Sequence, residues 1–108
     1  MTKKSEIISI EDLINRTEKY IDSDKITEIK KAYEFAKKAH YNQTRLTGDD
    51  YIVHPLNVAY ILTEIKADYI TICSALLHAV IEECGVTKEE LEENFGEEIA
   101  SIVYGFTK

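Results

Sequence analysis

The most apolar part of the chain is residues 68–83, which read DYITICSALLHAVIEE. Asp68 is of a residue type favoured at a helix N-cap, and Gly85 just beyond the run is a typical stop signal. The apolar residues between them occupy most sides of a helix, which is typical of a buried element. We therefore predict a central helix over about residues 69–83. The run is too short to cross a bilayer.

Helical spacing also accounts for the sequence on both sides of this central helix. Ser9 and Asp12 form a capping pattern for a first helix, and Thr87 and Glu90 form another for a short helix that ends before Gly96. The apolar faces predicted for the first three helices are Ile10, Leu13, Ile14, Thr17 and Ile21; then Ile26, Ile29, Tyr33, Ala36 and His40; then Val58, Ile61, Leu62 and Ile65.

The boundaries of the other elements are predicted from residues that typically start or end a helix. Residues 22–24 separate the first two helices, and the polar segment 42–51 is a predicted loop. The third helix is expected to open at Pro55, and a final helix is expected over about 97–104. No segment reads as a convincing strand. The sequence thus predicts an all-α fold, a bundle of about six helices.

Composition places the chain among folded single-domain proteins. It has 108 residues, of which 44% are apolar and 31% charged, and its net charge is −7. This acidic balance argues against a nucleic-acid backbone binder. Two cysteines outside any C-x-x-C pair form no disulfide framework, so a reduced cytoplasmic setting is expected. We expect no targeting segment and no membrane partner.

Two histidines stand out by position. His54 directly precedes Pro55 at a loop-to-helix junction, where a polar capping role is commoner than a functional one. His78 lies inside the most apolar run, where a ring without a partner would cost about 1–3 kcal/mol. A hydrogen-bonded core histidine is the commoner explanation of His78, and a ligand or catalytic role is the alternative.

Charged residues near these histidines are also candidates. Glu82 and Glu83 stand near the end of the predicted central helix, where negative charge opposes the helix dipole. Such a conflict is typical of functional sites, although two solvated glutamates explain it more simply. Arg45 in the polar loop is either solvated or able to bind phosphate or stack on a base. His40, at the end of the second predicted helix, is given no catalytic role.

Longer strings combine these residues in order. Residues 32–62, AYEFAKKAHYNQTRLTGDDYIVHPLNVAYIL, together with ALLHAVIEECGVT and ENFGEEIASIVYGFTK, closely resemble the RelA/SpoT family, whose members make and break the alarmone (p)ppGpp. The match is to the N-terminal hydrolase region, an HD-domain phosphohydrolase. It implies that residues 1–24 are an N-terminal helix and lead-in. Residues 25–108 are then the N-terminal part of the hydrolase domain, truncated at the C-terminus.

The resemblance implies a metal site. His54 and His78 match two histidine ligands of the family, and Glu82 and Glu83 match its acidic pair. The family site holds Mn²⁺, which neutralises phosphate charge and lowers the pKa of a bound water. The acidic pair orients that water or moves its proton. The implied reaction releases pyrophosphate from the 3′ position of guanosine tetraphosphate or pentaphosphate.

The resemblance also implies a nucleotide-binding loop. Arg45 matches an arginine that lines the guanine pocket, and Thr47 in the same loop is assigned to nucleotide binding with it. Leu46 stands where the family tends to have a basic residue. The family context implies the synthetase domain of a parent protein as a partner.

The chain departs from the family at its metal ligands. The His-Asp dyad reads His78-Ala79 here, and alanine cannot bind a metal ion. The second family aspartate lies further downstream than this chain reaches. We expect Mn²⁺ to bind weakly or not at all, because Mn²⁺ is at the weak end of the divalent affinity order. The acidic pair is Glu-Glu where the family usually has Glu-Asp.

Three hypotheses follow from this comparison. The first is a hydrolase region with little or no activity, because Ala79 and the missing distal aspartate remove ligands. The second is a non-catalytic guanine-nucleotide-binding or regulatory module. The third is an active hydrolase in which Glu82 or Glu83 replaces the missing aspartate, although both lie about one helical turn from Ala79. We also expect the isolated chain to self-associate or to be marginally stable.

Overall fold

The computed structural model of the chain describes residues 9–40, 53–78 and 80–106, except for the side chains of Val53, His54, Glu82, Glu83 and Phe106. Every regular element in these residues is helical, which confirms the all-α prediction. In chain order the elements are α1 (Ile10–Thr17), α2 (Ser23–Ala39), α3 (Val53–Leu62), the 3₁₀-helix η2 (Thr63–Ile65), α4 (Tyr69–Leu77), α5 (Val80–Cys84), α6 (Lys88–Phe95) and α7 (Glu97–Phe106).

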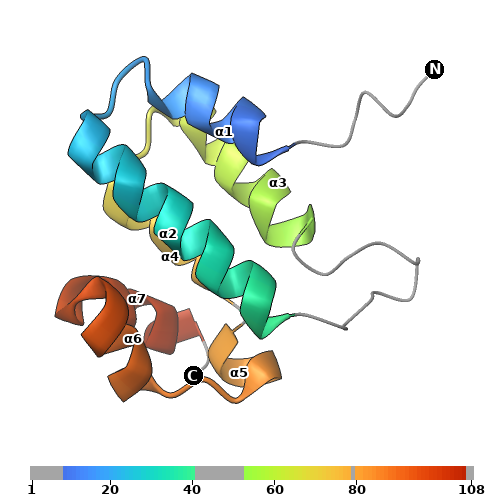
Figure 1. Ribbon diagram of the computed structural model, residues 1–108, viewed down its shortest axis with the longest axis vertical. Coiled ribbons are helices and arrows are strands. Elements are labelled where there is room, and N and C mark those ends of the chain that lie inside the picture. Colours follow the sequence, from blue (N-terminus) through green and yellow to red (C-terminus); the bar gives the residue numbers. More distant parts are fainter. Residues whose placement is uncertain (1–8, 41–52, 79, 107–108) are drawn as a thin grey trace.

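Helix α4 lies at the centre of the bundle. It packs against α2, α3 and α7, while α1 contacts α2 and α3, and α6 packs on α7. In Figure 1, α1 and α3 lie on one side of the α2–α4 pair, and α6 and α7 lie on the other. The six residues from Ile72 to Leu77 are all buried. The predicted central helix is therefore confirmed in its first half. No helix in the described ranges is long and apolar enough to span a membrane.

The second half of that predicted helix is wrong. Helix α4 ends at Leu77 with His78 as its C-cap, and a separate helix α5 follows. The backbone nitrogen and the ring Nδ1 of His78 lie 3.5 and 2.7 Å from the carbonyl oxygen of Ala75. A bond to residue i−3 tightens the last turn, and a side chain on the same carbonyl competes with helix continuation. The acidic pair therefore lies on a different helix from His78.

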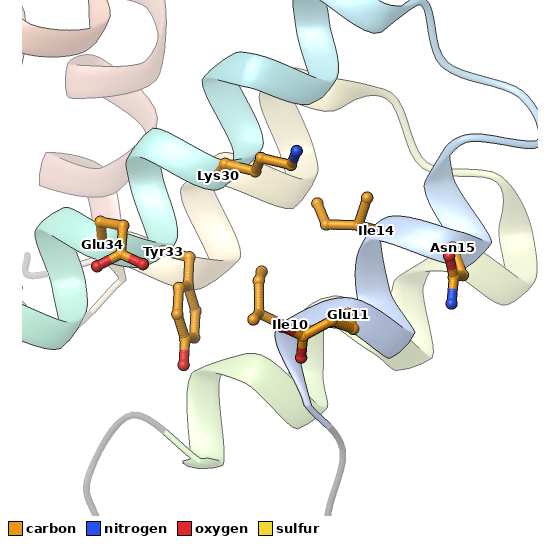
Figure 2. Close-up of a pocket in the computed structure, with 7 residues that line it drawn as sticks. All are labelled: Ile10, Glu11, Ile14, Asn15, Lys30, Tyr33 and Glu34. Carbon is orange, nitrogen blue, oxygen red and sulfur yellow. The ribbon is translucent and has the colours of Figure 1, made fainter.

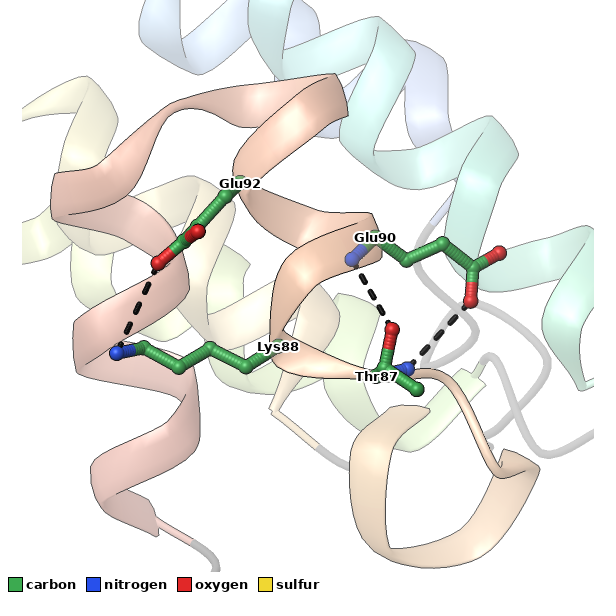
Figure 3. A network of polar contacts seen from close by, with 4 residues as sticks. All are labelled: Thr87, Lys88, Glu90 and Glu92. Atoms are coloured by element: carbon green, nitrogen blue, oxygen red, sulfur yellow. Dashed lines mark hydrogen bonds and ion pairs between the residues drawn. The ribbon is translucent and has the colours of Figure 1, made fainter.

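Helix α6 begins as its capping pattern predicts. The Thr87 hydroxyl accepts a hydrogen bond from the backbone N–H of Glu90 at 3.1 Å, and the Glu90 carboxylate accepts one from the Thr87 N–H at 3.5 Å (Figure 3). Figure 3 also shows the ion pair between Lys88 and Glu92, whose charged atoms lie 3.7 Å apart. The capping box satisfies backbone donors that the first turn leaves unpaired.

Two other predicted caps are also confirmed. Ser9 and Asp12 form the reciprocal capping box at the start of α1, and the Asp68 carboxylate accepts from the backbone N–H of Thr71 at the start of α4. Beyond α5, Gly85 adopts a φ of 75°, the left-handed conformation of a helix stop signal. Local capping chemistry thus positions the start of three helices and the end of α5.

The apolar face predicted for the third helix is wrong in part, because Val58 and Leu62 pack against the core but two other members of that face do not. Ile61 and Ile65 are 61% and 76% exposed. The helix also begins at Val53 rather than Pro55. Its buried side chains, with the adjoining η2 residue, are Pro55, Leu56, Ala59 and Thr63. Because α3 is apolar on almost all sides, periodicity alone could not identify the face that meets the core.

Other helix ends also differ from the prediction. Helix α1 ends at Thr17 rather than Ile21, and the Thr17 hydroxyl lies 3.1 Å from the carbonyl oxygens of both Leu13 and Ile14. Helix α7 continues to Phe106. The described residues hold seven α-helices and one 3₁₀-helix, where about six helices were predicted. The predicted loop 42–51 lies outside the described residues.

Candidate functional site

His78 occupies the C-cap of α4 and is half-buried. A carbonyl oxygen can only accept, so the ring Nδ1 that lies 2.7 Å from the oxygen of Ala75 carries the hydrogen. In the neutral ring the lone pair is then on Nε2. Histidines that bind metal ions commonly donate from one nitrogen to a backbone carbonyl in this way. His78 therefore has the partner that its apolar surroundings require, in an orientation compatible with a ligand.

A cavity of about 500 Å³ lies beside His78. It is formed between α3, α4 and α7, with mostly apolar walls, and His78 is the ionisable residue among those that line it. The lining residues are Val58, Leu62, Thr71, Ser74, Ala75, His78 and Ile102. This volume lies in the range of small-molecule sites, about 300–1,000 Å³. The cavity is therefore the candidate place for a ligand next to His78.

The other predicted site residues are placed only in part. His54 is the second residue of α3, and Glu82 and Glu83 lie within α5, but their side chains are outside the described part of the structure. Arg45, Thr47 and Ala79 lie outside the described residues altogether. The assignments of these residues to metal, proton transfer or nucleotide therefore stay predictions.

A second cavity, of about 440 Å³, lies between α1 and α2. Figure 2 shows its lining: Ile10, Glu11, Ile14 and Asn15 come from α1, and Lys30, Tyr33 and Glu34 come from α2. It shares no lining residue with the cavity beside His78. Its charges are of mixed sign, so it shows no clear preference for one class of ligand.

Comparison with known proteins identifies the fold family. A family model described as HD domain matches residues 32–108. The chain belongs to the HD domain family. Its relatives include the guanosine-3′,5′-bis(diphosphate) 3′-pyrophosphohydrolase of Aquifex aeolicus, 46% identical over 108 residues, which is the whole of this chain and 15% of that protein.

Other relatives of this HD domain carry related names. The bifunctional (p)ppGpp synthase/hydrolase SpoT of Escherichia coli is 45% identical over 89 residues, which is 82% of this chain and 13% of SpoT. A GTP pyrophosphokinase of Myxococcus xanthus is 51% identical over 80 residues, which is 74% of this chain and 11% of that protein. The chain thus spans a small fraction of the length of the curated relatives it matches. The predicted resemblance to RelA/SpoT proteins is confirmed.

The described side chains of this HD domain assemble no metal site by themselves, and the predicted ligand His54 is not among them. In the described ranges no three His, Cys, Asp or Glu side chains come together as a group that could hold a metal ion. Position 79, directly after His78, carries an alanine, which has no side-chain donor atom. The Nδ1 of His78 is used by the carbonyl of Ala75 and is not a donor for a metal ion. Mn²⁺ favours carboxylate, carbonyl and water oxygens and binds weakly to a few imidazoles.

One pair of chemically active side chains was missed by sequence reasoning. The Cys84 sulfur lies 3.3 Å from Nδ1 of His40, although the two residues are 44 positions apart. Cys84 closes α5 and His40 is the C-cap of α2. No sequence signal could have revealed the pair, because neither residue belongs to a spacing motif and only the packing of α5 on α2 joins them.

Proposed function

We propose that this HD domain is the N-terminal part of a (p)ppGpp 3′-pyrophosphohydrolase region whose metal site is disabled. The relatives support the assignment to a hydrolase region, since a 3′-pyrophosphohydrolase matches the whole chain at 46% identity. One observation supports the proposal that the metal site is disabled. His78 donates from Nδ1 to the carbonyl of Ala75, as histidine ligands commonly do, yet the next residue, Ala79, has no side-chain donor atom.

The loss of a ligand affects the reaction more than the shape of the domain. A bound divalent ion would lower the pKa of water and neutralise phosphate charge. Without it, neither of these contributions is available to the reaction. We assign water orientation and proton transfer to Glu82 and Glu83. The expected result is nucleotide binding with pyrophosphate release at or near background.

A non-catalytic guanine-nucleotide-binding or regulatory module is the second candidate. The cavity of about 500 Å³ beside His78 favours it, because a site of this size can accept a small ligand without any metal. Arg45 and Thr47 are the proposed nucleotide-binding residues. The synthetase domain of a parent protein is the proposed partner, because the relatives in which this region occurs are several times longer. We propose a cytoplasmic setting, in keeping with two cysteines that form no disulfide.

The deciding experiment measures pyrophosphate release from guanosine tetraphosphate with and without Mn²⁺, beside calorimetric titration of the nucleotide into the metal-free chain. We expect saturable binding and no release above background. Pyrophosphate release by the unchanged chain in the presence of Mn²⁺ would overturn the proposal that the metal site is disabled. Absence of both release and binding would overturn the hydrolase-region and nucleotide-module assignments together.

Two variants at one position test the metal argument. Ala79→Asp adds a carboxylate, and Ala79→Asn adds a side chain of the same shape with a neutral amide. Mn²⁺ binding, followed by electron paramagnetic resonance, should rise with Ala79→Asp and not with Ala79→Asn. Equal Mn²⁺ binding by both variants and by the unchanged chain would contradict the proposal. If Glu82 or Glu83 instead replaces the missing ligand, Glu82→Gln or Glu83→Gln should abolish any release by the unchanged chain.

A further inference from the structure

The two cysteines lie in contrasting environments. Cys73 is fully buried in α4, and burial raises the pKa of its thiol to about 12, with a smaller contribution from the charge of Glu28. Cys84 is the last residue of α5 and is partly exposed. A buried neutral thiol is inert, whereas a partly exposed thiol is accessible to small reagents. Cys73 is therefore an internal reference for the reactivity of Cys84.

Cys84 is paired with a buried imidazole. Its sulfur lies 3.3 Å from Nδ1 and 3.8 Å from Nε2 of His40. The contact joins two elements that are distant in sequence, because α5 packs against the C-terminal end of α2 (Figure 1). The His40 residue is only 3% exposed. Solvent thus reaches Cys84 from one side, while the imidazole contacts the sulfur from the protein interior.

This arrangement favours a reactive thiol. With the ring unprotonated at Nδ1, the Cys84 thiol donates to that nitrogen and can pass its proton to it. The product is a thiolate beside an imidazolium, and the thiolate is the nucleophilic form of cysteine. His40 is also the C-cap of the long helix α2, so its position is fixed by that helix.

We propose that Cys84 is a site of selective oxidation by small hydroperoxides, with His40 as the base that takes the thiol proton. The thiolate sulfur attacks one peroxide oxygen, so that an S–O bond forms as the O–O bond breaks. The leaving hydroxide takes a proton from solvent and departs as water when the reagent is hydrogen peroxide, and the His40 imidazolium then returns its proton to solvent. Sulfur is oxidised to the sulfenic acid and the peroxide is reduced. This inference is independent of the proposed hydrolase function.

The test treats the full chain at pH 7 with hydrogen peroxide in the presence of dimedone, which traps sulfenic acid, and then maps the adducts by mass spectrometry. Dimedone should mark Cys84 and not Cys73. Iodoacetamide should alkylate Cys84 in the folded chain about tenfold faster than in the chain unfolded by guanidinium, because His40 takes the thiol proton only in the folded chain and the thiolate is the nucleophile. No adduct at Cys84, or equal alkylation rates in the two states, would overturn the proposal.

Variants test whether Cys84 reacts because His40 activates its thiol or only because Cys84 is exposed to solvent. Cys73→Ser should leave the alkylation rate of the remaining thiol unchanged, and Cys84→Ser should abolish the dimedone adduct. His40→Asn and His40→Gln keep polar side chains that cannot take the thiol proton, so Cys84 should react about tenfold more slowly in them. An unchanged rate in a folded His40 variant, judged by circular dichroism, would overturn the role of His40. If both variants unfold, the proposal is decided by comparing the alkylation rates of Cys84 in the folded and in the unfolded states of the unchanged chain.

Discussion

The ring Nδ1 of His78 lies 2.7 Å from the carbonyl oxygen of Ala75, three residues earlier in the chain. This one contact satisfies a polar ring in apolar surroundings, sets its tautomer, and accompanies the end of α4. A helix end and a candidate functional histidine are therefore produced by the same hydrogen bond.

Removal of this hydrogen bond should destabilise the chain measurably. His78→Ala should lower the free energy of unfolding by about 1 kcal/mol, the usual net value of one intramolecular hydrogen bond. His78→Asn, which keeps a side-chain N–H and is a residue type tolerated at helix ends, should recover part of the loss. Urea denaturation followed by circular dichroism measures both. Identical stabilities of the two variants would show that the ring N–H contributes nothing.

The cap of α6 should contribute a comparable amount. The Thr87 hydroxyl accepts from the Glu90 N–H at 3.1 Å, so Thr87→Ala leaves that donor unpaired and should cost about 1 kcal/mol. Thr87→Ser retains the accepting oxygen and is the matched control, with a much smaller expected loss. The midpoints of urea denaturation measure both losses of stability, provided that the denaturant slope is the same in all three chains. If Ser and Ala lower the midpoint equally, the capping bond is not the source of the loss.

The buried thiol of Cys73 should make stability depend on alkaline pH. Its folded pKa of about 12 is above the ordinary value of 9.0, so the unfolded chain loses this proton first as pH rises. The unfolded state then binds fewer protons, and the free energy of unfolding falls between about pH 9 and 12, with a slope of at most about 1.4 kcal/mol per pH unit. Below pH 9 this contribution is fully present.

The control for this pH effect is Cys73→Ala. It removes the thiol while retaining every other titrating group, including Tyr20, whose pKa is also raised by burial. The difference in slope between the two chains above pH 9 therefore reports Cys73 alone, measured by urea titration at each pH. Parallel stability profiles over this range would show that the Cys73 thiol titrates normally in the folded chain.

Exposed apolar side chains should make the isolated chain self-associate. Ile61, Ile65, Ile102 and Tyr104 are 61%, 76%, 38% and 40% exposed, respectively. Ile65→Lys should reduce association because it places a charge on the most exposed of these positions, and it should change stability by less than about 0.5 kcal/mol. Sedimentation velocity over a range of concentrations measures the association. Thr27→Lys, on the exposed side of α2, is the matched charge control. A chain that stays monomeric at every concentration would contradict this expectation.

Resemblance to family motifs identified candidate site residues, but it did not predict how those residues are arranged in space. The resemblance singled out His78, and the structure gives that ring a partner in Ala75. The apolar pattern of residues 69–83 predicted Glu82 and Glu83 on the helix of His78, whereas the structure places them on α5. The reason is that a helix with continuous apolar character carries no periodic signal for a break, and the break depends on one side chain competing for a backbone carbonyl.

Local sequence was sufficient for the helical class, the three side-chain N-caps and the central burial of residues 72–77, because capping and periodicity depend on residues within about four positions of one another. Packing between helices decided that Ile61 and Ile65 stay exposed and that Cys84 meets His40. The face that an apolar helix buries, and the side chain that a distant residue meets, depend on the surface that other helices supply. That surface exists only once the chain has folded.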